Sequence, residues 1–195
     1  MKNIANVALL STLFTTTALA DNTGKFYGAF DAGKVLFSNT KQPAFNNINF
    51  PNPAAMRISG GYRYNPVLAV EAGYTVIADS KIIVGSNQLK FRSAAFQIAA
   101  VGSYPVNDEF ELLGKLGLSV NSNQLTGAGT YADLNTSNAS NTLVYGIGAK
   151  YNINQQIGLR VQYENFGESK VSESITNTSW KVGSAMFSMG LVYSF

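Results

Sequence analysis

The last nine residues of the chain alternate between apolar side chains and mostly small ones. The apolar positions are Phe187, Met189, Leu191, Tyr193 and Phe195. Successive side chains of a strand point to opposite faces, so this period of two predicts a strand with one apolar surface. A strand that closes a barrel in lipid needs such an outer face, with aromatic side chains at the membrane interface. The stretch is therefore predicted to be the closing strand of a β-barrel.

The first 20 residues have the features of a cleavable secretory signal. Lys2 provides the positive charge, residues 4–14 the short apolar run, and Ala18 and Ala20 the small side chains before the cleavage site. No later stretch approaches the ~20 apolar residues that a membrane-spanning helix needs. Residues 1–20 are thus predicted to direct export, and residues 21–195 to form one domain that can cross a membrane only as a barrel.

Eight segments of the exported part alternate with a period of two. They are residues 25–37, 54–64, 67–77, 89–104, 110–120, 142–151, 156–165 and 180–195. Short turns join some of them, and the longer polar segments 38–53, 78–88, 121–141 and 166–179 join the others. Segment 121–141 is mostly Asn, Ser, Thr and Gly, which predicts a mobile surface loop. The predicted fold is an all-β, eight-stranded, antiparallel up-and-down transmembrane barrel with short periplasmic turns and long extracellular loops.

The register of the first strand is left open by two charged residues. Asp31 and Lys34 fall on opposite parities of the segment. Either a β-bulge shifts the register between them, or Lys34 lies beyond the bilayer.

Fixed charges stand in the middle of several strands, on the parity opposite the apolar side chains. They are Arg57, Glu71, Lys115, Lys150 and Arg160. The same parity is rich in Gly and Ser, which suits a narrow interior. Charged residues make up only 13% of the chain, against roughly 25% in globular domains. These features favour a barrel with its apolar face in lipid over a soluble exported barrel that binds an apolar ligand.

Tyrosines mark one predicted membrane boundary. Tyr64, Tyr104 and Tyr151 each precede a short turn, and Tyr193 stands at the same level of the last strand. Amphipathic rings settle at headgroup depth, so these four residues are predicted to form a periplasmic aromatic girdle.

Several function classes are disfavoured by composition. The chain has no His and no Cys, which removes the side chains most often used for triads, metal sites and thiolate chemistry. Loss of Lys2 with the signal leaves 13 basic against 11 acidic residues, too small an excess to argue for nucleic acid. We expect no enzyme activity, no cofactor and no metal.

Three segments resemble the OmpA-type transmembrane domain. Residues 98–117 resemble its fourth-to-fifth strand hairpin, residues 65–74 its third strand, and residues 189–195 its terminal assembly signal. The resemblance implies that Phe187, Met189, Leu191, Tyr193 and Phe195 are read by the barrel assembly machinery. The peptidoglycan-binding domain of larger OmpA proteins has no counterpart in the sequence.

The resemblance also implies a plug of paired charges inside the barrel. By similarity Glu71 is the strand-three Glu, Arg160 the strand-seven Arg and Lys115 the strand-five basic residue. Val101 stands where a family Lys is expected, and Lys150 where an acidic partner is expected. We therefore expect Lys115, Lys150, Arg160 and Arg57 to gather around Glu71, with Asp31 or Glu164 as further anions.

Two interpretations of this interior remain. An unpaired buried charge costs several kcal/mol, so the charges can form a structural network that fills the lumen. Alternatively, they line a narrow or gated ion path that slightly favours anions.

The predicted function is a non-enzymatic outer-membrane barrel, structural and surface-exposed, with a small or gated porin as the alternative. Its predicted partners are outer-membrane lipid, lipopolysaccharide and an extracellular or host ligand held by the loops. Basic residues near the loop side would attract anionic headgroups, although scattered solvated lysines explain them equally well. These residues are Lys81, Lys90, Arg92, Lys170 and Lys181.

Overall fold

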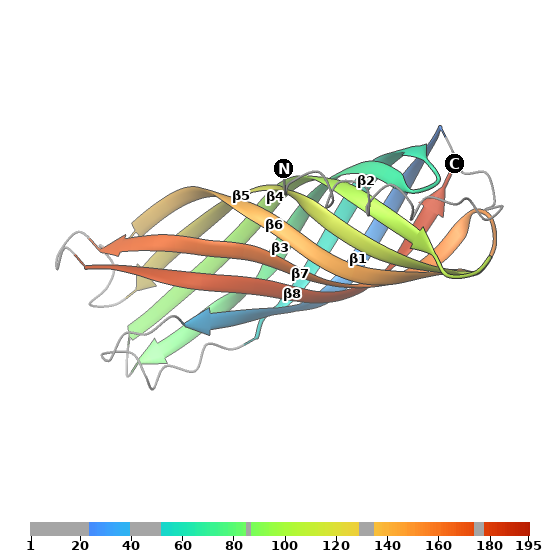
Figure 1. Cartoon of the computed structure of the whole chain (residues 1–195). Coiled ribbons are helices and arrows are strands. Elements are labelled where there is room, and N and C mark those ends of the chain that lie inside the picture. Colours follow the sequence, from blue (N-terminus) through green and yellow to red (C-terminus); the bar gives the residue numbers. More distant parts are fainter. Residues whose placement is uncertain (1–23, 40–51, 85–86, 129–134, 174–177) are drawn as a thin grey trace, which may run out of the picture.

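The computed structural model describes residues 24–39, 52–84, 87–128, 135–173 and 178–195, and these form eight strands (Figure 1). The strands are β1 (Lys25–Asn39), β2 (Ala54–Asn65), β3 (Leu68–Val84), β4 (Asn87–Pro105), β5 (Phe110–Ala128), β6 (Asn135–Asn152), β7 (Ile157–Glu173) and β8 (Thr178–Ser194). The predicted signal, residues 1–20, lies outside the described residues.

The eight strands close into an antiparallel up-and-down barrel. Each strand pairs with the next in sequence, and β8 returns to pair with β1. We call the end that holds the short turns and the carboxyl terminus the turn end, and the opposite end the loop end (Figure 1). Closure gives the ladder no free lateral edge in the paired region, which is the condition for crossing lipid with strands. The predicted fold is confirmed.

The strands extend further toward the loop end than the alternation of apolar residues predicted. Residues 78–84 belong to β3, 121–128 to β5, 135–141 to β6 and 166–173 to β7. The prediction of a loop over 121–141 was therefore wrong for the parts paired in the β5–β6 ladder, while 129–134 lie outside the described residues. A ladder is held by backbone hydrogen bonds, so it continues where the side chains are polar and no apolar core can be read from the sequence.

The pairing of β1 tests whether a β-bulge lies between Asp31 and Lys34. Pairing with β2 is continuous from Lys25 to Lys34, so the predicted bulge in β1 was wrong. Lys34 is exposed on the outer face, whereas Asp31 is buried. Register shifts occur instead at Arg63/Asn65, Ile77/Ser80 and Asn165/Glu168.

Apolar side chains cover the outside of the barrel, and charges occupy its inside. Ile58, Leu118 and Ile147 expose 66%, 67% and 71% of their surface, whereas Arg57 and Glu71 expose 0% and 1%. A soluble barrel would have the reverse arrangement, so the alternative of a soluble barrel around an apolar ligand was wrong. Within the described ranges, no helix is long and apolar enough to cross a membrane.

The outer face carries aromatic side chains at two levels. Near the turn end lie the four predicted tyrosines Tyr64, Tyr104, Tyr151 and Tyr193, all exposed. Phe26 and Tyr62, which the girdle prediction did not include, pack together at this level with ring centroids 4.9 Å apart, and Tyr193 meets Phe195 edge-on at 5.2 Å. Closer to the loop end a second exposed set consists of Tyr74, Phe96, Tyr145, Tyr163 and Phe187.

Inward-facing glycines leave room for large side chains of the neighbouring strands inside the barrel. A Cβ added at Gly61 would collide with the ring of Tyr27, which lies over this glycine. A Cβ at Gly190 would collide with the carboxylate of Asp31 in the same way. The inward glycines are therefore the counterparts of the large inward side chains on the neighbouring strands.

We expect Gly61→Val to lower the free energy of unfolding by about 1–3 kcal/mol, because the added methyls overpack the lumen against Tyr27. Gly60→Val is the matched control: the side chain would point outward, and its Cβ would meet no atom closer than 3.9 Å. Urea unfolding of both refolded variants, followed by gel mobility without boiling, measures the difference. Equal midpoints for the two variants would contradict the proposed packing.

Candidate functional site

The lumen is built in layers because each strand presents a fixed order of inward side chains. On β1 the inward order from the turn end is Tyr27, Ala29, Asp31, Gly33 and Val35. On β5 it begins with Glu111, Leu113 and Lys115. On β1, apolar inward residues therefore lie on both sides of Asp31. The barrel brings inward residues of similar depth on different strands close together in the lumen.

Glu71 of β3 lies at the centre of the main charge cluster. Lys115 Nζ donates to its Oε1 at 2.8 Å, and Arg160 Nη1 donates to its Oε2 at 2.6 Å. The Tyr27 hydroxyl adds a hydrogen bond to the same Oε2 at 3.1 Å. These donors come from β5, β7 and β1, so one carboxylate ties together strands from around the barrel.

Asp31 of β1 is held by two guanidinium groups. Arg160 donates through Nε and Nη2 to the two carboxylate oxygens at 2.8 and 2.6 Å. Arg57 Nε donates to Oδ2 at 3.0 Å. The fork of a guanidinium matches the two oxygens of a carboxylate, which makes such a pair strong and directional.

Glu164 of β7 completes the cluster. Arg57 Nη1 pairs with Oε2, and Lys115 Nζ lies 2.5 Å from Oε1. Arg57 also donates to Gln162 Oε1 at 2.6 Å, and Arg160 to Ser59 Oγ at 2.9 Å. The central cluster therefore contains three acids, Asp31, Glu71 and Glu164, and three bases, Arg57, Lys115 and Arg160.

The central cluster is balanced in charge and closed to solvent. None of its six charged side chains exposes more than 3% of its surface. The predicted anions are both present, since Asp31 and Glu164 each pair with two bases. The predicted basic excess around Glu71 was wrong, because a lumen this dry favours only compensated charge.

Lys150 belongs to a second cluster at the turn end, not to the surroundings of Glu71. Its Nζ donates to Glu111 Oε1 at 3.2 Å, and Asn152 Nδ2 donates to the same oxygen at 2.8 Å. Arg63 lies 3.5 Å from Glu111 Oε2 and donates to the Pro66 carbonyl at 3.1 Å. The prediction missed Glu111 and Arg63 as lumen residues, although both share the parity of inward residues on their strands.

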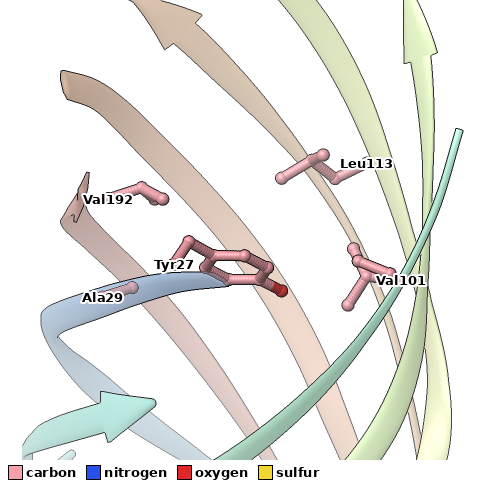
Figure 2. Close-up of a cluster of buried hydrophobic side chains, with 6 residues drawn as sticks. Tyr27, Ala29, Val101, Leu113 and Val192 are labelled. Atoms are coloured by element: carbon pink, nitrogen blue, oxygen red, sulfur yellow. The ribbon is translucent and has the colours of Figure 1, made fainter. Parts of the chain in front are cut away.

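An apolar layer separates the two clusters. It consists of Tyr27, Ala29, Ala69, Val101, Leu113 and Val192. Figure 2 shows the Tyr27 ring extending from β1 across the lumen toward Val101 of β4. Val101 thus contributes apolar surface at the position where a basic residue was expected from the resemblance.

A second apolar layer lies on the loop side of the central cluster. It consists of Val35, Ala55, Val144, Phe166 and Met186, with Ile77 packed against it. Val144 and Met186 expose none of their surface. The central charges therefore lie between two groups of packed apolar side chains, and on the loop side Ser119, Asn121 and Thr142 add a buried hydrogen-bonded set from β5 and β6.

An exposed ionic group lies at the loop end. Asp79 faces Lys90 at 2.8 Å and Arg92 at 3.2 Å across the β3–β4 ladder. The hydrogen bond from Arg92 and that from Lys90 lower the pKa of Asp79 to about 2. Asp79 neutralises part of the basic surface predicted here. The side chains of Lys81, Lys170 and Lys181 lie outside the described part of the structure.

The lumen carboxylates of the described residues are arranged in ion pairs. No group of three or more Asp or Glu side chains there is arranged to hold a metal ion. The lumen carboxylates are all engaged by cations, so none is placed to act as a base toward a Ser or Thr hydroxyl. The geometry of the lumen charges therefore suits a structural role, in which ion pairs join the strands and fill the interior of the barrel.

A closed antiparallel barrel with an apolar exterior and a charge-paired interior defines the class of transmembrane β-barrels. Within that class, residues 20–195 match the model of the OmpA-like transmembrane domain. The chain belongs to this family of outer-membrane barrels. No curated protein matches the chain.

Solved structures of other outer-membrane barrels share the fold. Neisserial surface protein A is 21% identical over 87% of this chain and 97% of its own, with a TM-score of 0.63. The attachment invasion locus protein Ail of Yersinia pestis is 15% identical over 89% of this chain and 99% of its own, with a TM-score of 0.60. OprG of Pseudomonas aeruginosa is 13% identical over 89% and 96%, with a TM-score of 0.56.

We expect Glu71→Gln to lower the free energy of unfolding by about 3–5 kcal/mol, because it leaves Lys115 and Arg160 incompletely paired in a dry interior. Urea unfolding of the refolded barrel measures the loss. Asp108→Asn, in an exposed turn, is the control and should change stability by no more than about 0.5 kcal/mol.

A double-mutant cycle tests the separation of the two clusters. Glu71→Gln and Glu111→Gln should add within about 0.5 kcal/mol, because their partners are not shared. Glu71→Gln and Glu164→Gln should deviate from additivity, because both acids contact Lys115. Strong coupling between Glu71 and Glu111 would show that the apolar layer does not isolate the clusters.

Proposed function

We propose that this protein is a non-enzymatic structural component of the outer membrane with a closed lumen and an exposed loop end. The observation that carries the proposal is the neutral central cluster between two apolar layers. Ions passing through would have to separate buried pairs and pass two groups of packed apolar side chains, both of which are costly. The family membership supports the location in the outer membrane.

The orientation follows from the family and from the two ends of the barrel. The turn end, with Tyr64, Tyr104, Tyr151 and Tyr193 as interfacial girdle, faces the periplasm, and the loop end faces outward. Residues 1–20 direct export. The outward residues Phe187, Met189, Leu191 and Tyr193 of β8, together with Phe195 just beyond it, then serve as the segment that the assembly machinery recognises.

The loop end provides the surface for partners. Lys90 and Arg92 are exposed there beside Asp79, and lipopolysaccharide phosphates are anions of the kind that such basic side chains attract. A complex of Ail with a heparin analogue, sucrose octasulfate, gives a precedent for polyanion binding by a barrel of this shape. An extracellular polyanion or host surface is the corresponding ligand class for this protein.

A gated channel is the second candidate, supported by the turn-end cluster. Arg63 exposes 13% of its side chain, and its 3.5 Å contact with Glu111 is the longest of the lumen ion pairs. This pair is the one that solvent from the turn end can reach first. A gate would still require displacement of the central cluster.

Planar-bilayer recording distinguishes the two candidates. We expect the refolded wild-type barrel to show no stable conductance steps at neutral pH, because the lumen is sealed. Glu71→Ala should either stay silent or give rare, small steps, since the two apolar layers persist. Stable steps in the wild type that change with Glu71→Ala would overturn the closed-lumen proposal in favour of the channel.

Deletion of Phe195 tests the role of the last strand. Its backbone N–H donates to the Phe26 carbonyl at 2.9 Å, and the residue as a whole is 70% exposed. Losing one peripheral hydrogen bond should leave refolding in detergent nearly intact, whereas assembly in cells should fall strongly. Heat-modifiable protein in outer-membrane fractions measures assembly. Equal losses in detergent and in cells would indicate a structural role only.

A further inference from the structure

The cluster at the turn end does not share the charge balance of the central cluster. Arg63 Nη2 lies 3.5 Å from one oxygen of Glu111, and Lys150 Nζ lies 3.2 Å from the other. Among the described residues, these contacts are the only ion pairs that the two bases form. Two cations therefore share one carboxylate, which leaves one positive charge in excess.

A third base stands beside Arg63. Lys25 is exposed at the start of β1, on the same parity as the inward residue Tyr27, and it lies directly opposite Arg63 in the β1–β2 ladder. Like charges at directly opposed positions destabilise a sheet. The described part of the chain gives Lys25 no ion pair. We call Lys25, Arg63, Glu111 and Lys150 the turn-end mouth; its three bases and one acid leave an excess of two positive charges.

Other acids of the described chain do not balance this excess. Asp108 and Glu109 are exposed in the turn between β4 and β5, and neither forms an ion pair with a base of the mouth in the described residues. Toward the centre, the apolar layer around Tyr27, Val101 and Leu113 separates the mouth from the acids of the central cluster. The described part of the chain thus leaves two positive charges at this end without a matching acid.

Arg63 keeps donors available for a further acceptor. A guanidinium has five N–H donors, and the described contacts engage Nη1 with the Pro66 carbonyl at 3.1 Å and Nη2 with Glu111. The side chain of Arg63 is 13% exposed, whereas that of Lys150 is 5% exposed. Arg63 and the exposed Lys25 are therefore the groups that an anion entering from the turn end meets first.

The depth of the mouth indicates the kind of anion. Arg63 stands between Tyr62 and Tyr64, which are both exposed on the outer face. Lys25 precedes Phe26, whose ring packs on Tyr62. Aromatic rings on the outside of a barrel settle at headgroup depth. The two bases therefore lie at the level of the phosphate groups of the turn-end leaflet.

We propose that the turn-end mouth binds a phosphate group between Lys25 and Arg63. The planar guanidinium matches two oxygens of a phosphate, and the ammonium beside it adds a point charge. A phosphate monoester carries about −1.5 to −2 charges at neutral pH, which is close to the excess of two at the mouth. A lipid headgroup and a soluble phosphate offer the same chemistry, and the experiment distinguishes these two sources.

An NMR titration of the isotope-labelled, refolded barrel in a non-ionic, phosphate-free detergent tests the proposal. One arm replaces sodium chloride by sodium phosphate at constant ionic strength, and the other adds phosphatidylglycerol to the micelles. We expect saturable shifts of the Lys25 amide signal and of the Arg63 side-chain N–H signals. Saturation by inorganic phosphate supports binding of a soluble phosphate, and saturation in the lipid arm alone supports binding of a headgroup. Signals that do not shift in a saturable way in either arm would overturn the proposal.

Matched variants show whether the shifts report this mouth. Lys25→Gln should raise the dissociation constant about threefold, whereas Lys34→Gln, also exposed on β1 but toward its loop end, should leave it unchanged. Arg63→Gln should raise it at least about tenfold, because hydrogen bonds from a charged donor are lost; Arg92→Gln, at the loop end, is its control. Glu111→Gln should lower it, because this carboxylate competes with phosphate for Arg63. Equal effects of the two Lys variants, or an unchanged affinity in Arg63→Gln, would overturn the proposal.

Discussion

Everything in this barrel depends on pairing charges inside a tube too narrow to hydrate them. An isolated ion in such an interior costs several kcal/mol, so each carboxylate must meet its cations and each cation its carboxylates. Asp31, Glu71 and Glu164 meet Arg57, Lys115 and Arg160 in one neutral group. The group connects β1, β2, β3, β5 and β7, and so the pairing that satisfies the charges also fixes the strands around the barrel.

The apolar layers give this cluster its environment. Tyr27 belongs to the turn-side layer and also to the central cluster, because its ring packs in that layer while its hydroxyl donates to Glu71. Phe166 and Met186 close the loop side. A dry environment strengthens each ion pair and makes an unpaired state costly, so the same layers that seal the lumen also keep the cluster assembled.

Outside the membrane the constraint changes, because water can satisfy backbone groups that lipid cannot. The wall must be continuous at the level of Tyr145 and Asn165, but it is free to open above them. The β6–β7 pairing ends at this level, and the bulge at Gly167 with its shift of the β7–β8 register follows directly beyond it. Closure in lipid and an interrupted β6–β7 ladder beyond it are therefore two consequences of one solvent rule.

The sequence alone determined the strands that cross the membrane and the face on which each side chain lies. Period-two alternation placed Arg57, Glu71, Lys115 and Arg160 on one parity, and any closed barrel turns one parity inward. Which residues pair was decided by the tertiary structure, because strand tilt and register set depth in the lumen. Lys150 thus meets Glu111 instead of Glu71, and Asp31 meets Arg160, 129 positions away. The strand ends were also decided there, since backbone pairing extends β5 and β6 through polar sequence that carries no signal of burial.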